Sequence, residues 1–75
     1  MKIVVVSDSH GRNDILKTIQ EKHPNAKLFI HCGDLEDDPM YYPGYIIVRG
    51  NNDYFGRFEN ERIIPIGKHQ IYVTH

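Results

Sequence analysis

Four short apolar segments of this 75-residue chain are each followed at once by side chains that can bind a metal ion. The candidate ligands after the four segments are Asp8, His10, Asp34, Asn51 and His75. Carboxylate, imidazole and amide donors form a mixed set that suits Mn²⁺, Fe, Zn²⁺ or Ni²⁺ and differs from a thiolate site. Two such cations about 3.5–4 Å apart can clamp the attacking and leaving oxygens of a displacement at phosphorus and lower the pKa of a bound water. The residue types therefore indicate metal-assisted chemistry on a phosphate ester.

The candidate ligands can meet only if the apolar segments are strands of one sheet, and the first half of the sequence predicts such an arrangement. Residues 3–6 are β-branched and apolar on both faces, which is typical of a strand in the middle of a parallel sheet. A helix is expected next, with Asn13 as its N-cap and Pro24 limiting it near His23. Residues 28–30 predict a second buried strand, which completes a right-handed βαβ unit. Ligands bind outside the carboxyl ends of parallel strands, so the candidate residues should converge there if the four strands run the same way.

The second half of the sequence predicts a loop, a strand and a hairpin. Residues 35–44 are rich in acidic residues, proline and tyrosine, which indicates a loop or a short irregular helix before a strand at residues 45–48. Residues 62–66 and 70–74 flank Gly67 and Lys68 and predict a β-hairpin. Pro65 cannot donate a ladder hydrogen bond, so the first hairpin strand should lie at an edge. The expected fold class is α/β, with a mainly parallel sheet and an edge hairpin.

Composition excludes several other classes of protein. The chain has 9 Lys and Arg residues against 10 Asp and Glu residues and a formal net charge of -1, which gives no broad basic surface for nucleic acid. Its apolar runs are far shorter than the roughly 20 residues of a membrane span, and Met1-Lys2 does not open a signal-peptide core. One cysteine cannot form an internal disulfide or a thiolate cage. We therefore expect a cytoplasmic protein with a small phosphoester substrate and no membrane partner.

The motifs also carry a family resemblance, which covers the whole chain. The blocks Asp8-Ser9-His10, Gly33-Asp34, Gly50-Asn51-Asn52-Asp53 and Val73-Thr74-His75 resemble, in this order, those of the calcineurin-like metallophosphoesterase superfamily. The short spacings resemble its YfcE-like phosphodiesterase branch. The resemblance implies a dinuclear site in which Asp8 and His10 hold the first metal, Asp34 bridges both, and Asn51 and His75 hold the second. It also implies a phosphodiesterase that hydrolyses phosphate esters by metal-activated hydroxide, with two divalent ions, Mn first and Ni, Zn or Fe as alternatives.

Two departures from the family pattern bear on these expectations. Many relatives have a histidine acid at the position of Asn52, and an amide cannot donate a proton at pH 7. Asn52 and Asp53 nevertheless occupy the family's catalytic positions, and we assign them to catalysis. The family's Gly-His-x-His block does not occur in the chain, so residues 1–75 are expected to be a single partial domain, the N-terminal half of a four-layer α/β/β/α sandwich. Such a half should self-associate or require a C-terminal half. The alternative function is a non-catalytic protein-interaction scaffold with this fold.

Several other conspicuous residues are expected to be structural. His31 lies inside a predicted strand and should be a core histidine with a partner or part of the site rim, and Cys32 should be a small buried residue. The acidic cluster at residues 36–38 is interpreted as a solvated loop. Tyr54 and Phe55 follow the third motif closely enough to line a substrate pocket.

Overall fold

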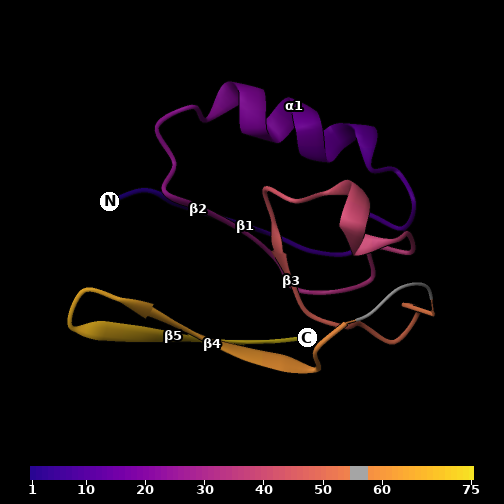
Figure 1. The fold of residues 1–75 in the computed structure, drawn as a ribbon. Coiled ribbons are helices and arrows are strands. Elements are labelled where there is room, and N and C mark those ends of the chain that lie inside the picture. The colour runs from indigo at the N-terminus through magenta and orange to yellow at the C-terminus, as the bar shows by residue number, and fades with distance from the viewer. Residues whose placement is uncertain (55–57) are drawn as a thin grey trace.

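The chain folds into three layers, a helix, a parallel sheet and a β-hairpin (Figure 1). The computed structural model describes residues 1–54 and 58–75. The parallel sheet contains β1 (Ile3–Val6), β2 (Leu28–His31) and β3 (Ile46–Ile47), in the order β1-β2-β3. Helix α1 (Asp14–Lys22) covers one face, and the hairpin of β4 (Glu61–Ile66) and β5 (His69–Thr74) lies under the other (Figure 1). These observations confirm the predicted α/β class with a parallel sheet and a hairpin.

Two apolar clusters hold the layers together because β2 alternates its side chains between the two faces of the sheet. Phe29 packs toward the helix-side cluster, whose buried members are Leu16, Leu35, Tyr45 and Ile47. Its neighbour Ile30 belongs to the hairpin-side cluster, whose other buried members are Val48, Ile64 and Val73. The Tyr45 hydroxyl donates to the Leu16 carbonyl at 2.7 Å and joins the sheet layer to α1. The sheet is therefore anchored on both of its faces.

The predicted elements differ from the structure in three respects. The segment 3–6 forms a strand, but β2 is the central strand of the described sheet, β1 lies at its edge, and Val5 is 61% exposed. The hairpin is not an edge of the parallel sheet but forms a second sheet, which the described residues join to the first through a parallel bridge between Val48 and Glu59. Asn13 precedes α1 as expected, yet its side chain makes no capping hydrogen bond because it turns toward other partners.

The segment between β2 and β3 is ordered by its own acidic residues. It contains a single 3-10 turn, η1 (Pro39–Tyr41), which agrees with the expected short irregular helix. The Asp38 carboxylate accepts the Met40 N–H at 2.9 Å and caps this turn. Asp37 accepts the Tyr42 hydroxyl at 2.7 Å, which holds the pKa of Asp37 below its ordinary value. The acidic cluster lies in a partly exposed loop, as expected, and two of its carboxylates also form hydrogen bonds that shape the turn.

None of the helices formed by the described residues is long and apolar enough to cross a membrane.

Candidate metal centre

The ends of three strands bring three of the predicted ligands together. Asp8 follows β1, Asp34 follows β2 and His75 follows β5, and one donor atom from each lies within 4.8 Å of the others. The parallel register pairs Val6 with His31, so the loops that carry Asp8 and Asp34 leave the sheet side by side. Two carboxylate oxygens and an imidazole nitrogen at this spacing fit a divalent cation, in agreement with the mixed donor set of the sequence.

Backbone hydrogen bonds continue the pairing of β1 and β2 beyond the strands themselves. The amide groups of Asp8 and His10 donate to the carbonyl groups of Gly33 and Asp34, at 2.8 and 3.0 Å. Gly11 then donates to Leu35 at 3.1 Å. The two ligand loops are therefore tied to each other residue by residue, which restrains the distance between their side chains.

The ligand loops hold an unusual backbone conformation. Asp8, His10 and Asp34 have positive φ angles of 57°, 48° and 60°, and Glu36 follows with 59°. Residues other than glycine seldom adopt this left-handed region, and each such strained conformation costs about 1–3 kcal/mol. Strain of this kind persists only where the surroundings over-determine it and clusters at functional sites. Its concentration on three predicted ligands supports a functional role for these loops.

Each of the two histidines has an orienting partner on Nδ1, while its Nε2 faces Asp8 or Asp34. The Nδ1 of His75 lies 2.6 Å from the carbonyl oxygen of Cys32, and because a carbonyl only accepts, Nδ1 must carry the proton. The Nε2 of His75 is the nitrogen left to face the group, and it lies 3.8 Å from Oδ2 of Asp34. His10 hydrogen-bonds the Glu36 carboxylate through Nδ1, which raises the pKa of His10, and its Nε2 lies 3.6 Å from Oδ1 of Asp8. Metal-binding histidines characteristically use one nitrogen in this way and offer the other to the ion.

Hydrogen bonds also orient the two carboxylates of the group. The backbone N–H of Asn52 donates to Oδ1 of Asp34 at 2.9 Å, and the Asn52 amide donates to Oδ2 at 3.4 Å. The pKa of Asp8 is lowered, chiefly by a hydrogen bond from the Ser7 side chain. These hydrogen bonds fix the orientation of the Asp34 carboxylate, and the Ser7 contact favours the charged form of Asp8.

Asp53 is buried, and its carboxylate gathers backbone donors from both neighbouring loops. Oδ2 accepts the N–H groups of Asp34 and Gly50, Oδ1 accepts that of Glu36, and all three distances are 2.7 Å. Gly50 lies so close to Asp34 that a Cβ at position 50 would overlap the carboxyl group and backbone nitrogen of Asp34. This packing leaves Asp53 inside the protein, where it fixes the backbone that carries Asp34.

Asn51 is the predicted ligand for which the structure shows least. It lies in the turn after β3, its side chain is exposed, and it forms no hydrogen bond with another described residue. Asn52, next to it, is also exposed but is bound to Asp34 as described above. The structure therefore gathers Asp8, His10, Asp34 and His75 at one edge, with Asn51 at its border.

Comparison with known proteins shows which family the chain belongs to. The model of the calcineurin-like phosphoesterase superfamily domain matches residues 1–75. The chain belongs to this superfamily. The recognition made from the motifs is thereby confirmed.

Two relatives of the superfamily resemble the chain along its length. The probable metallophosphoesterase YsnB of Bacillus subtilis (strain 168) is 40% identical over 79 residues, which cover 100% of this chain and 46% of YsnB. The crystal structure of a conserved uncharacterized protein of Streptococcus pneumoniae TIGR4, described as a predicted phosphoesterase, has a TM-score of 0.88 and 29% identity. That match covers 97% of this chain and 44% of the other. The chain thus spans less than half the length of each relative.

Several residues in and around the candidate site were not predicted from the sequence, or were predicted with another role. Glu36 was assigned to a solvated loop, yet it orients His10, and its place two residues after the Gly33-Asp34 motif is the only sequence signal for it. The backbone carbonyl of Cys32 carries no sequence signal at all. The Cys32 side chain is half-buried and its pKa is raised by burial, which agrees with a structural role. His31 is fully buried with partners on both ring nitrogens and is confirmed as a core histidine.

The predicted pocket residues are not confirmed by the structure. Tyr54 is 81% exposed, and Phe55 lies outside the described residues.

Proposed function

We propose that the protein is a phosphodiesterase that hydrolyses small phosphoesters at a site for two divalent cations. The observation that carries the proposal is the convergence of Asp8, Asp34 and His75 within 4.8 Å, in a chain of a phosphoesterase superfamily. The residues proposed to hold the cations are Asp8, His10, Asp34, Asn51 and His75. Asp8 and His10 would hold one ion, Asn51 and His75 the other, and Asp34 would contact both.

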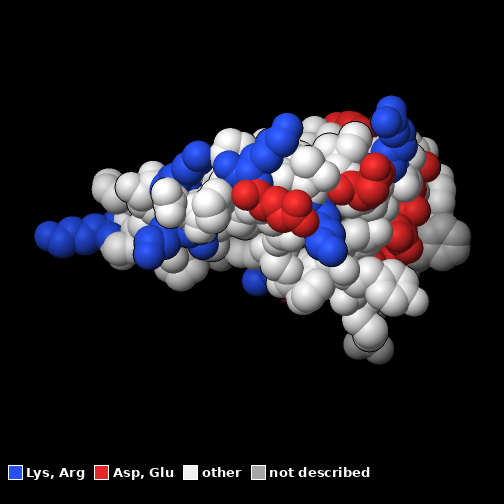
Figure 2. Space-filling view, turned by 90° about the horizontal axis from the view of Figure 1, so that it is seen from above, with Lys and Arg blue, Asp and Glu red and all other residues white. Residues whose placement is uncertain are grey.

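Charge and donor chemistry support this assignment. Acidic side chains gather on the right-hand part of the helix-covered face and basic ones predominate on the left (Figure 2). The right-hand part is where the loops after β1 and β2 lie (Figure 1). Such a negative edge attracts cations, and the mixed oxygen and nitrogen donors favour Mn²⁺ over Mg²⁺ or a purely thiolate-bound metal. Cations held there would supply a Lewis acid for a phosphoryl oxygen and lower the pKa of a water molecule.

The chain's own residues give the proposal its substrate preference. Asn52 is exposed beside Asp34, where its amide can hydrogen-bond a phosphoryl oxygen but cannot protonate a departing alkoxide. Esters with good leaving groups should therefore react best. The Asp53 carboxylate binds the backbone N–H of Asp34 and not its side chain. In this proposal Asp53 is therefore a positioning residue that acts through the Asp34 backbone.

A cleft beside Asp8 supplies room for the organic part of a phosphodiester. The cleft measures about 450 Å³ and is lined by Val6, Ser7, Asp8, Ser9, Arg12, Ile15, Leu16 and Ile19. Its walls combine apolar side chains of α1 with the guanidinium of Arg12, which suits an ester group that is apolar in its body and anionic at its phosphate. The cleft therefore has room for an organic group of the phosphoester substrate.

The test is metal content measured together with hydrolysis. After Mn²⁺ loading and desalting, elemental analysis should find about two ions per chain, and the loaded protein should hydrolyse an activated aryl phosphodiester. Asp34→Ala should lose both the ions and the activity. Glu21→Gln, which removes an exposed carboxylate from α1, should keep both. Retention of Mn²⁺ and full activity by Asp34→Ala would refute the proposal.

The amide at position 52 also favours a second candidate, a scaffold that binds partners without turnover. The same experiment separates the two, because a scaffold would show no hydrolysis of any phosphoester even when two ions are bound. Hydrolysis that is abolished by Asp34→Ala excludes it.

A further inference from the structure

His31 is the fully buried last residue of β2, and neither its side chain nor that of Ser9 has a task in the proposed reaction. Both of its ring nitrogens are occupied. The Gly33 N–H donates to Nδ1 at 3.1 Å, and Nε2 lies 3.0 Å from the Oγ of Ser9. The ring thus joins the loop after β2 to the loop after β1.

The partners of His31 determine which nitrogen carries its proton. A backbone N–H can only donate, so Nδ1 must offer a lone pair. Burial lowers the pKa of His31, which favours the neutral ring, and the single proton then resides on Nε2. Nε2–H therefore donates to the Ser9 oxygen, and the Ser9 hydroxyl proton is free for another acceptor.

Asn13 provides that acceptor and extends the chain of hydrogen bonds. The Ser9 hydroxyl donates to Oδ1 of Asn13 at 2.7 Å, and Nδ2 of Asn13 donates to the Leu35 carbonyl at 3.3 Å. Because a carbonyl can only accept, the orientation of the Asn13 amide is fixed as well. The hydrogen bonds run in one direction, from Gly33 through His31, Ser9 and Asn13 to Leu35.

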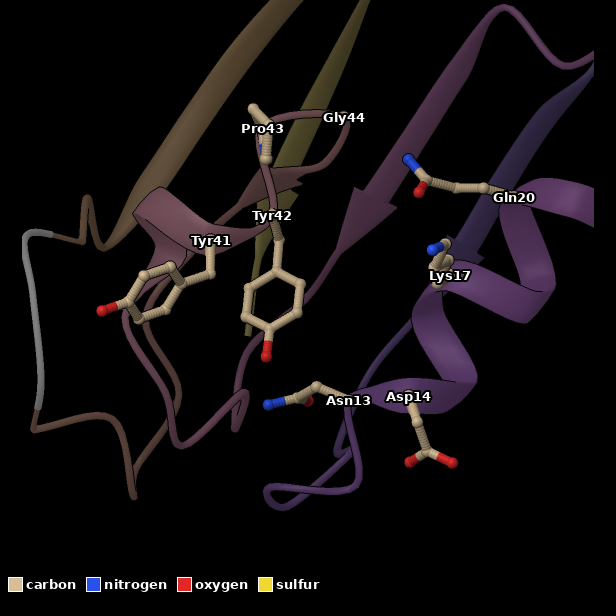
Figure 3. A pocket seen from close by; sticks show the side chains of 8 residues that line it. All are labelled: Asn13, Asp14, Lys17, Gln20, Tyr41, Tyr42, Pro43 and Gly44. Atoms are coloured by element: carbon tan, nitrogen blue, oxygen red, sulfur yellow. The ribbon is translucent and has the colours of Figure 1, made fainter.

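The residues of this hydrogen-bond chain flank the proposed ligands in the sequence. It begins at Gly33 and ends at Leu35, on either side of Asp34, and Ser9 lies between Asp8 and His10. Asn13 is only 6% exposed, and the Tyr42 ring points its hydroxyl toward it from the opposite wall of a cleft of about 430 Å³ (Figure 3). The Asn13 side chain is used in these hydrogen bonds with Ser9 and Leu35, which explains why it does not cap α1.

We propose that His31 and Ser9 are positioning residues of the cation site. Their one-way chain holds the loop of Asp8 and His10 against the loop of Asp34, so that the carboxylates face each other before any ion arrives. The inference rests on the proposed function for the identity of what is positioned. Beyond that function, the inference states that the hydrogen bonds from Gly33 to Leu35 run in one direction and that cation affinity depends on them.

Cation affinity tests the dependence, with Mn²⁺ as the probe in titration calorimetry of the purified protein. Loss of a residue that orients metal ligands typically costs 10–100-fold in affinity, so Ser9→Ala should bind Mn²⁺ about 10-fold more weakly or worse. Ser9→Thr keeps the hydroxyl and should bind nearly as the wild type does. His31→Asn keeps an acceptor for the Gly33 N–H but cannot reach Ser9, and it should weaken binding like Ser9→Ala.

A matched control accompanies these variants. Thr18→Ala removes an exposed hydroxyl of α1 that takes no part in the hydrogen bonds from Gly33 to Leu35, and it should leave the Mn²⁺ affinity unchanged. Rescue by threonine at position 9, together with an unchanged Thr18→Ala, separates positioning from a general loss of structure.

The direction of the chain is tested in the metal-free wild type by the imidazole nitrogen resonances of His31. Near neutral pH they should show a proton on Nε2 and none on Nδ1. A proton on Nδ1, or wild-type affinity in Ser9→Ala, would overturn the inference while leaving the proposed function intact. A wild type that binds no Mn²⁺ would contradict the proposed function and would reduce the chain to a structural tie, which overturns the positioning role too. These outcomes distinguish the two failures.

Discussion

Replacing Asp53 with asparagine removes one acceptor from a buried carboxylate that three backbone amides share. Asp53 is 3% exposed, and the N–H groups of Asp34, Gly50 and Glu36 all donate to it at 2.7 Å. The asparagine side chain is nearly isosteric, so the substitution changes hydrogen bonding and charge while hardly changing volume. It therefore tests whether this carboxylate holds the loop after β2, which carries Asp34, against the turn after β3.

The expected loss of stability follows from the number of acceptors. An amide has a single oxygen, which in its better orientation keeps the two donors of Asp34 and Gly50 and turns its NH₂ toward the Glu36 N–H. One hydrogen bond to a charged group, worth about 1.5–3 kcal/mol, is then lost and a largely desolvated donor is left without a partner. We expect the free energy of unfolding to fall by about 2–4 kcal/mol, a large part of the 5–15 kcal/mol of an ordinary domain.

Urea unfolding of the metal-free protein measures this loss, with the m-value as a check that the same surface becomes exposed. Asp38→Asn is the matched control, because the Asp38 carboxylate accepts the Met40 N–H as a cap and asparagine caps equally well. A decrease of less than about 0.5 kcal/mol in Asp53→Asn, the usual range of a neutral surface change, would refute the reasoning.

Three further predictions concern the neighbours of this carboxylate and the site it supports. Glu36→Gln should lower the pKa of His10 toward its ordinary value, because the Glu36 carboxylate is the main cause of the increase; an NMR titration that shows no change would contradict the contact. Gly50→Ala should weaken Mn²⁺ binding and cost about 1–3 kcal/mol of stability, since the new Cβ overlaps the Asp34 carboxyl; calorimetry and urea unfolding measure both. The pKa of His31 is lowered from 6.5 by burial, so the unfolded chain takes up the proton first as pH falls. Stability from this residue is therefore complete above pH 6.5 and is lost as pH falls through the folded pKa, and the denaturation midpoint should decrease less in His31→Asn than in the wild type; equal decreases would count against this reasoning.

The strand-end rule predicted the meeting of Asp8 with Asp34 for the correct reason. Both residues follow parallel strands in register, and backbone hydrogen bonds continue that pairing between their loops. His75 reaches the same place for a different reason, because β5 belongs to an antiparallel hairpin under the sheet and not to the sheet itself. The prediction of convergence succeeded for Asp8, Asp34 and His75, although β5 lies outside the sheet that carries the other two.

Other features could not be predicted because the sequence does not encode them in any short pattern. An apolar segment such as residues 3–6 shows that both faces meet other groups, but not which of its edges is paired, so β1 was wrongly placed at the centre. Hydrophobic periodicity is also silent on the left-handed conformations of Asp8, His10 and Glu36, which are uncommon outside glycine. The partnership of Glu36 with His10 depends on that conformation and so could be found only in three dimensions.

The hydrogen bonds around the ligand loops keep their strained backbone conformation in place. Four residues in the left-handed region would each be expected to relax to an ordinary conformation if the loops were free. They are prevented from doing so by the amide ladder from residues 8–11 to residues 33–35, by the three donors on Asp53, and by the His31–Ser9–Asn13 chain. All of these restraints are made by the protein alone and involve none of the donor atoms offered by Asp8, Asp34 and His75. The geometry that gathers the ligands is therefore set before a cation binds, and the affinity of the site need not be reduced by the cost of ordering its loops.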